Sequence, residues 1–238
     1  MARLGRYFVA GQPLHVIQRG NGSGRIFFTE ADFAQYRAWL IEAAQAYGLA
    51  VHAYVLMPDH VHLLVTPSSA ESLPRTMQSL GRRYVRHINA RTGRTGTLWE
   101  GRYRAAPIDS DEYFIACCRY IEMNPVRARR VAYPRDWRWS SYRAHAQGGA
   151  DALAAFHPLL RRLGRSLAER QQAWRALARK KLDPAFVRAL RDATNGGWAL
   201  GDERFRKEIA RRAKRRAAPL PRGPRPAAGA TRRQRKRP

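Results

Sequence analysis

The sequence predicts an α+β fold built on a small antiparallel sheet, with helices packed on one face. Three observations predict it. Two adjoining β-branched-rich runs are joined by a two-residue turn signal, amphipathic helical segments separate the extended runs, and the elements follow the order β-α-β-β-α-β-α. A helical C-terminal region is expected to follow this sheet domain.

The extended runs come first. Leu14–Gln18 predicts a short strand, and Tyr103–Ile108 predicts another further along the chain. Val51–Met57 and His60–Val65 are separated only by Pro58-Asp59, which is a turn pair. These two runs therefore predict a hairpin.

Two long helices are expected between the strands. From Glu30 to Tyr47, apolar side chains recur every three or four residues, and Gly48 is placed to end the helix. Ser72–Ala90 carries a similar apolar stripe. Both segments are amphipathic, so each is expected to cover the sheet with its apolar side.

A third helix is expected after the last strand. Asp109 and Glu112 have the spacing of a capping box, with Asp in place of Ser or Thr. The helix is expected to end at Met123 or Asn124, because Pro125 disfavours helical geometry in the residue before it. The complete order predicts a ferredoxin-like antiparallel sheet.

The chain divides by composition into three parts. Residues 1–146 form the sheet domain, and residues 150–216 are expected to be a helical, DNA-binding extension. Residues 217–238 are rich in Pro, Gly, Ala and Arg, so they are expected to be a disordered basic tail that cannot form a core.

The charge points to a polyanionic partner. The formal net charge is +27, and it is uneven: residues 1–150 hold 20 basic and 11 acidic side chains, whereas the remaining 88 residues hold 25 and 7. Nucleic acid is the commonest polyanion available, although a solvated basic surface or a ribosome-associated tail would show the same composition. Nonspecific, salt-sensitive binding is expected from the basic tail in either case.

Location follows from what the sequence lacks. No apolar run approaches the length of a membrane span, and the N-terminus has no signal-peptide core. Cys117 and Cys118 are adjacent and cannot form a disulfide framework. A cytoplasmic, nucleoid-associated protein is therefore expected.

Two histidines form the first candidate site. His60 and His62 are two residues apart on a predicted strand, so both imidazoles point to the same face of the sheet. Two such rings can bind a divalent metal ion through nitrogen, with a third ligand from elsewhere. Taken alone, two partly exposed strand histidines without a function are at least as common.

Tyr120 and Asn124 form the second candidate site. They are four residues apart on one predicted helix, and therefore lie on the same side of it. If that helix crosses the sheet face of His60 and His62, Asn124 would supply an amide oxygen to the metal and Tyr120 would lie beside it. Spacing alone favours the simpler alternative, in which Tyr120 is a core residue.

Several further motifs favour a functional site over a core role for Tyr120, because they occur in the order and at the spacing of a known family. These motifs are Tyr54–Val65, His15–Asn21, Leu98–Tyr103, Tyr120–Arg127 and Trp137–Tyr142. Through them the chain resembles the single-tyrosine HUH transposases, and more closely the REP-associated tyrosine transposases, over about residues 5 to 145.

The resemblance implies a function for each candidate. His60 and His62 match the metal-binding pair of the family, Tyr120 its nucleophile, and Asn124 its polar third ligand. Asp59 stands where many relatives have Asn, and it is expected to close the hairpin turn rather than to bind the metal. The expected reaction is cleavage and rejoining of single-stranded, hairpin-bearing DNA through a 5′-phosphotyrosine bond, with loosely held Mg²⁺ or Mn²⁺.

Other side chains are expected to contact the DNA. Arginines near the site are candidates for phosphate binding, and aromatic side chains are candidates for base stacking, although aromatic residues in a small domain more often belong to the core. The arginines are Arg19, Arg102, Arg104, Arg127, Arg129 and Arg130; the aromatic residues are Trp99, Tyr103, Trp137 and Trp139.

Two alternatives keep the fold but change the function. The chain could regulate or package nucleic acid without catalysis, or it could be an HUH nicking enzyme of plasmid replication or conjugation. The presence of all four residue types at the site argues against the first, and the extent of the match argues against the second. Both a monomer and a homodimer are compatible with the sequence.

Overall fold

The computed structural model describes residue 7, residues 9–109 and residues 113–220. Its centre is a four-stranded sheet in the order β2-β3-β1-β4, with every neighbouring pair antiparallel. The strands are β1 (Leu14–Arg19), β2 (Leu49–Met57), β3 (His60–Pro67) and β4 (Arg104–Pro107). One helix connects β1 to β2 and another connects β3 to β4, which confirms the predicted ferredoxin-like arrangement.

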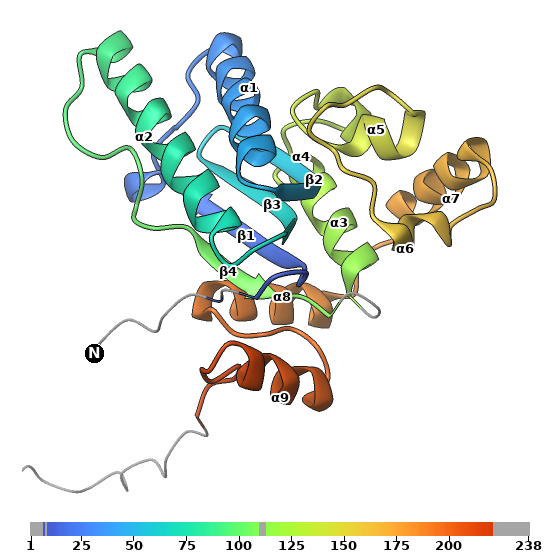
Figure 1. Cartoon of the computed structure of the whole chain (residues 1–238). Coiled ribbons are helices and arrows are strands. Elements are labelled where there is room, and N and C mark those ends of the chain that lie inside the picture. The colour runs from blue at the N-terminus through green and yellow to red at the C-terminus, as the bar shows by residue number, and fades with distance from the viewer. Residues whose placement is uncertain (1–6, 8, 110–112, 221–238) are drawn as a thin grey trace, which may run out of the picture.

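Helices α1 (Glu30–Ala46) and α2 (Ser72–Thr92) lie side by side on one face of the sheet (Figure 1). Thr29 and Asp32 form a capping box that opens α1, and Gly48 follows its end with a positive φ of 64°. Alternate strand residues, such as Val61 and Leu63, point into the core between the sheet and these helices.

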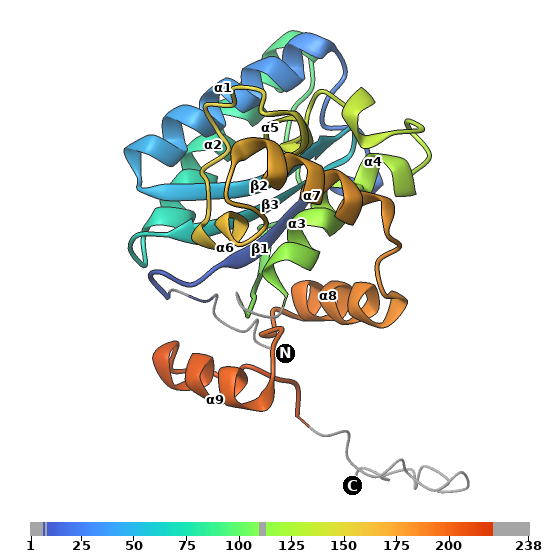
Figure 2. The same cartoon turned by 90° about the vertical axis from the view of Figure 1, so that its right-hand side faces the viewer.

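The second face of the sheet is also covered, which corrects the prediction of helices on one face only. Helix α3 (Phe114–Glu122) packs on β2 and β3, and α8 (Pro184–Gly196) packs on β4 and β1 (Figures 1 and 2). The strands carry apolar residues on this face too, including Val55, Leu64 and Ala106. A sheet that is apolar on both faces needs cover on both.

The remaining helices are short or belong to the C-terminal region. They are α4 (Asn124–Arg127), α5 (Tyr142–Gln147), α6 (Pro158–Arg161), α7 (Leu167–Arg179) and α9 (Glu203–Arg212), together with the 3₁₀ turns η1 (Asn21–Ser23) and η2 (Pro134–Asp136).

The helix that carries Tyr120 is shorter than predicted. It ends at Glu122, the chain leaves helical geometry at Met123, and α4 begins at Asn124. Pro125 lies in the first turn of α4, where a missing N–H costs no hydrogen bond. At the other end of the helix, Glu112 lies outside the described residues, so the capping box remains a prediction.

The C-terminal helices share a core with the sheet domain. Trp174 of α7 and Leu190 of α8 are buried in the cluster that also contains Tyr120. The N–H of Leu200 donates to the carbonyl of Pro107 at the end of β4, at 2.8 Å. The domain boundary at residue 146 stays a prediction, but residues on the two sides of it pack in one core.

Ordered chain continues past the expected start of the tail. Ala217 is buried, and its carbonyl accepts a hydrogen bond from the Ala199 N–H at 2.9 Å. Residues 221–238, which include most of the predicted tail, lie outside the described residues.

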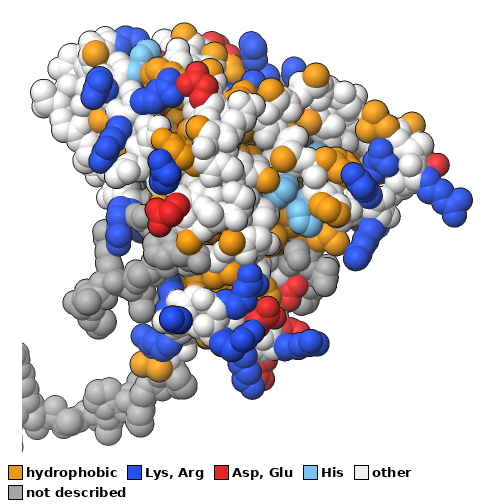
Figure 3. All heavy atoms as spheres, in the orientation of Figure 1, with side chains coloured by type: hydrophobic (Ala, Val, Ile, Leu, Met, Phe, Trp, Pro, Cys, Tyr) orange, Lys and Arg blue, Asp and Glu red, His pale blue; other side chains and the backbone are white. Residues whose placement is uncertain are grey.

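Basic side chains gather around α9 (Figure 3). Some of them are paired along the helix, as Lys207 is with Glu203 at 2.8 Å and Arg212 with Glu208 at 3.6 Å. None of the described helices is both long and apolar enough to cross a membrane.

Candidate functional site

His60, His62 and Tyr120 converge on one face of the sheet, as the sequence predicts. The two histidine rings lie edge to face with centroids 5.0 Å apart, and the ring of Tyr120 lies 5.6 Å from that of His62. Strand β3 turns both histidines to the sheet face on which α3 packs, since alternate residues share a face, and α3 places Tyr120 beside His62. His62 and Tyr120 are both buried.

His15 completes this cluster, although its residue pattern did not mark it as a site residue. It is buried on β1, and its ring lies edge to edge with that of His62, with an interplanar angle of 7° and a centroid distance of 5.0 Å. The Tyr120 ring lies 5.9 Å away, edge-on. The one sequence signal was its place in the His15–Asn21 motif, because neither spacing nor composition connects it with His62.

Hydrogen bonds assign the protons on these two rings. Thr194 of α8 donates its single hydroxyl hydrogen to the carbonyl of Leu190 at 2.8 Å. His15 Nδ1 must therefore donate to Thr194 Oγ1, at 2.7 Å. In a neutral ring, His15 Nε2 then accepts from His62 Nδ1, at 2.9 Å, which leaves the lone pair of His62 on Nε2.

Both rings are held neutral by their surroundings. Burial, with a smaller contribution from the Arg127 charge, lowers the pKa of His15 to about 3. Burial also lowers the pKa of His62 well below 6.5, with the charges of His15 and His60 acting in the same direction. A neutral imidazole keeps a nitrogen lone pair, which a metal ligand requires.

Asp59 has two roles in the hairpin. It lies in the turn between β2 and β3, as expected, and its Oδ1 also accepts from His60 Nδ1 at 2.9 Å. This hydrogen bond lowers the pKa of the Asp59 carboxyl. It also turns the Nε2 atom of His60 away from the carboxylate, and a carboxylate behind an imidazole is a common way to orient a metal ligand.

Two arginines contact Tyr120. The Arg127 guanidinium lies 4.0 Å from the centroid of the Tyr120 ring, and its Nη1 donates to the Tyr120 carbonyl at 2.6 Å. Arg191 of α8 donates from Nε to the Tyr120 hydroxyl at 3.3 Å. No sequence pattern connects Arg191 with Tyr120, because the two residues are 71 positions apart.

Asn124 is close to the cluster in sequence but is not bonded to it. It opens α4 and is 7% exposed. Its side-chain amide forms no hydrogen bond with any residue that the structure describes, including His60 and His62. Within the described ranges, no group of three or more His, Cys, Asp or Glu is placed to hold a metal ion.

The arginines predicted to bind DNA form two groups. Arg19, Arg102 and Arg104 line one small pocket beside Glu100 at the edge of β1 and β4. Arg104 is partly engaged there, since it donates to Glu100 at 3.4 Å and to Asn195 at 3.2 Å.

The second group follows α4. Arg127 turns back onto Tyr120, while Arg129 and Arg130 are exposed in the turn after the helix. Arg129 adopts a positive φ of 54°, which is uncommon for a residue with a side chain. Of these three arginines, Arg127 is the one that contacts the nucleophile candidate.

The aromatic residues considered for base stacking are mostly core residues. Trp99, Tyr103 and Trp139 are buried in the cluster beneath α1 and α2, and Trp137 is partly buried against both cores. Trp139 stacks on Phe33 at 5.3 Å. Burial leaves their ring faces unavailable to bases in this conformation, so packing explains them.

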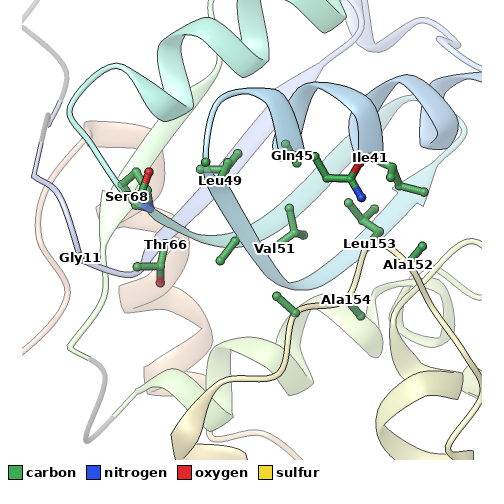
Figure 4. Close-up of a pocket in the computed structure, with 15 residues that line it drawn as sticks. Gly11, Ile41, Gln45, Leu49, Val51, Thr66, Ser68, Ala152, Leu153 and Ala154 are labelled. Carbon is green, nitrogen blue, oxygen red and sulfur yellow. The ribbon is translucent and has the colours of Figure 1, made fainter.

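A larger cavity lies elsewhere. It has a volume of about 560 Å³ and opens between the end of α1, the edge of β2 and residues 152–155 (Figure 4). Its lining is mostly apolar, with Ile41, Leu49, Val51 and Leu153 among its residues, and it contains none of the predicted site residues.

Comparison with known proteins places part of the chain beside a family of transposases. Residues 9–124 match the family model described as transposase, IS200-like. A protein of Haemophilus influenzae, assigned by its name to the REP-associated tyrosine transposases, is 24% identical over an alignment of 118 residues that covers 45% of this chain and 67% of that protein.

A solved structure supports the fold. It is that of a REP-associated tyrosine transposase bound to a REP hairpin, with a TM-score of 0.54 and 18% sequence identity, covering 66% of this chain and 93% of that one. The resemblance predicted from the sequence is therefore confirmed over residues 9–124, which match the IS200-like transposase family model.

Proposed function

We propose that this transposase-family chain cleaves and rejoins single-stranded DNA with Tyr120 as the nucleophile. One observation carries the proposal: His60, His62 and Tyr120, which come from β3 and α3, meet on one sheet face with ring centroids 5.0 and 5.6 Å apart. A core tyrosine would need neither the two histidines nor the two arginine contacts around it.

A divalent cation, Mg²⁺ or Mn²⁺, fits the residues at this place. His60 and His62 each have Nδ1 engaged in a hydrogen bond, to Asp59 and His15, and each Nε2 is without a hydrogen bond to any described residue. Asn124 is buried with an unbonded amide, whose oxygen is the proposed third ligand. Two imidazoles and an amide suit a loosely held ion.

The ion, when bound, would neutralise negative charge on the phosphate and orient it. The protein would supply the nucleophile and hold the phosphate among its arginines. The Tyr120 oxygen forms a bond to phosphorus, the bond from phosphorus to the 3′-oxygen breaks, and the phenolic proton leaves for water as the 3′-oxygen gains one.

The linkage formed is a 5′-phosphotyrosine, and the released strand ends in a 3′-hydroxyl. Because the phosphodiester is replaced by another phosphodiester, a different 3′-hydroxyl can reverse the step and join strands. This reversibility is what transposition requires of such an enzyme.

Hairpin-bearing DNA is the proposed substrate. The solved relative is bound to a REP hairpin, and the chain carries a net charge of +27, with arginines along β1, β4 and α4. Phosphate contacts from these arginines would hold the strand near Tyr120 and make binding sensitive to salt.

The proposal is tested with a hairpin oligonucleotide and Mn²⁺. The full chain should form a covalent adduct that survives denaturing electrophoresis, and the adduct should carry a label from the 3′ end of the DNA but not one from its 5′ end. Tyr120→Phe should bind the same DNA and form no adduct. Absence of any adduct with either metal would favour the binding protein without catalysis.

A further inference from the structure

Helix α8 reaches into the site with two residues on one of its sides. Thr194 bonds His15 at 2.7 Å, and Arg191, one turn earlier, bonds the Tyr120 hydroxyl through Nε at 3.3 Å. We propose that Arg191 is a further catalytic residue: its Nε holds the Tyr120 hydroxyl while its two terminal nitrogens bind the phosphate under attack. This inference rests on the proposed function, and α8 lies outside residues 9–124, the segment that matches the family model.

The guanidinium of Arg191 is available for a phosphate. Arg191 is exposed, and its bond to Tyr120 is its one hydrogen bond or ion pair among the described residues. Its terminal nitrogens are therefore free beside a buried hydroxyl. An arginine presents its donors in a planar fork that matches two phosphate oxygens, so one side chain can touch both reacting groups.

The charge around Tyr120 is uncompensated. Arg127 lies over the ring and Arg191 lies at the hydroxyl, and neither forms an ion pair with a carboxylate in the described part of the chain. The two unpaired guanidinium groups beside the nucleophile candidate therefore form a potential anion-binding site. A phosphate diester carries one negative charge and gains more on its non-bridging oxygens as the tyrosine attacks, which strengthens its attraction to Arg191.

The position of Arg191 is fixed by the packing of α8. Leu190, Ala193 and Thr194 are buried on the side of the helix that faces the sheet. After the helix, Leu200 exchanges backbone hydrogen bonds with the end of β4, donating to Pro107 at 2.8 Å and accepting from Asp109 at 2.9 Å. The backbone of Arg191 is anchored in this way, and the hydrogen bond to Tyr120 directs its side chain toward the site.

Arg191 neither gives nor takes a proton in this scheme. It remains a cation throughout, since a guanidinium does not deprotonate in proteins. The bonds made and broken are those of the proposed reaction, with phosphorus passing from the 3′-oxygen to Tyr120. The arginine stabilises the charge on the phosphate during that transfer.

The test compares Arg191→Ala with Arg188→Ala, which removes an exposed arginine from the same helix. Single-turnover cleavage of a hairpin oligonucleotide with Mn²⁺, over a range of protein concentrations, separates the rate constant from DNA affinity. Arg191→Ala should lower the rate constant by about 100-fold, as loss of one preorganised donor does, and change affinity by less than about threefold. Arg191→Lys should recover part of the rate.

Arg188→Ala should retain the wild-type rate constant. If Arg191→Ala cleaves as fast as Arg188→Ala, the proposal is wrong. If Arg191→Ala is faster than wild type, the contact restrains Tyr120 instead of assisting it, and the proposal is equally wrong.

A second measurement tests phosphate binding without DNA cleavage. Inorganic phosphate should raise the thermal midpoint of wild type and of Arg188→Ala by similar amounts, and raise that of Arg191→Ala by less. Equal rises in both variants would overturn the phosphate contact even if wild type forms no adduct. Failure of wild type to form an adduct counts against the proposed function, whereas normal cleavage by Arg191→Ala counts against this inference alone.

Discussion

His15 and His62 lie edge to edge, with 7° between their ring planes and 2.9 Å between His15 Nε2 and His62 Nδ1. This contact connects β1 to β3 through side chains as well as through the backbone ladder. It leaves His62 with one nitrogen bonded inside the protein and the other available. His15 therefore occupies the position of a residue that orients a metal ligand through a hydrogen bond, with His62 as that ligand.

His15→Phe should weaken metal binding. Phenylalanine keeps the flat ring against His62 but cannot accept its Nδ1 hydrogen, so the His62 ring loses its fixed proton and orientation. We expect Mn²⁺ affinity to fall by about 10- to 100-fold, measured as free Mn²⁺ by electron paramagnetic resonance. His87→Ala, a histidine of α2 outside the site, should bind Mn²⁺ as wild type does. Unchanged affinity in His15→Phe would rule out this role.

Asp59→Ala should weaken metal binding through the other histidine. Asp59 Oδ1 accepts from His60 Nδ1 at 2.9 Å, and without it the His60 ring is free to turn. The same Mn²⁺ titration should show a loss of about tenfold or more. Asp136→Ala removes an exposed carboxylate paired at 3.8 Å with Arg135 and should leave the affinity unchanged. Equal affinities in the two variants would mean that Asp59 only closes the turn.

Acid should destabilise the fold through His15. Its pKa is about 3 in the folded protein and near 6.5 in the unfolded chain, so below pH 6.5 the unfolded state binds the extra proton. Stability from this residue is therefore complete above about pH 6.5 and falls as the pH drops toward 3. At pH 5 the loss from His15 is roughly 2 kcal/mol, by the usual 1.36 kcal/mol per pH unit.

Urea unfolding at pH 7 and pH 5 measures this effect. The decrease in unfolding free energy between the two pH values should be smaller in His15→Phe than in wild type, by roughly 2 kcal/mol. His52, whose pKa is also lowered, is retained in both proteins and cancels in the comparison. The same decrease in both would show that His15 is not held neutral by burial.

Trp174→Ala should destabilise the whole chain. Trp174 of α7 is buried, and its indole N–H donates to Glu122 of α3 at 2.8 Å. The same carboxylate accepts from Ser141 and from His145, each at 2.6 Å. Loss of a large buried side chain costs about 3–5 kcal/mol, and here it also removes a partner of a buried charge.

Urea unfolding, monitored by far-ultraviolet circular dichroism of the backbone, should show this decrease in unfolding free energy as a single transition. Leu167→Ala, at a 54% exposed position at the start of the same helix, should change the unfolding free energy by less than about 0.5 kcal/mol. Two separate transitions, with only one shifted by Trp174→Ala, would indicate that the C-terminal helices fold on their own.

Local patterns predicted much of the fold. Alternation along β3 placed His60 and His62 on one face, and the recurring apolar residues predicted α1 and α2 to within two residues at their ends. Cover on the second face was missed, because α8 has no sequence relation to the strands it packs on. Its place is set by tertiary contacts such as that of Leu200 with Pro107.

The site was predicted only in part, for the same reason. His60, His62 and Tyr120 were named because their motifs are compact in sequence. His15 and Thr194, which bond one another, are 179 positions apart, and Arg191 is 71 from Tyr120. No periodicity connects such pairs. Aromatic residues considered for DNA stacking, such as Trp99 and Trp139, are core residues, as general burial preferences favour.

The most direct measurement of the central claim is the site of DNA attachment. Trypsin cleaves after Arg119, so the peptide Tyr120–Arg127 begins with the proposed nucleophile. After reaction with a hairpin oligonucleotide and Mn²⁺, nuclease and trypsin digestion followed by mass spectrometry should find this peptide with a nucleotide joined to Tyr120 through its 5′-phosphate. An adduct mapped to another residue, or one that persists in Tyr120→Phe, would contradict the account.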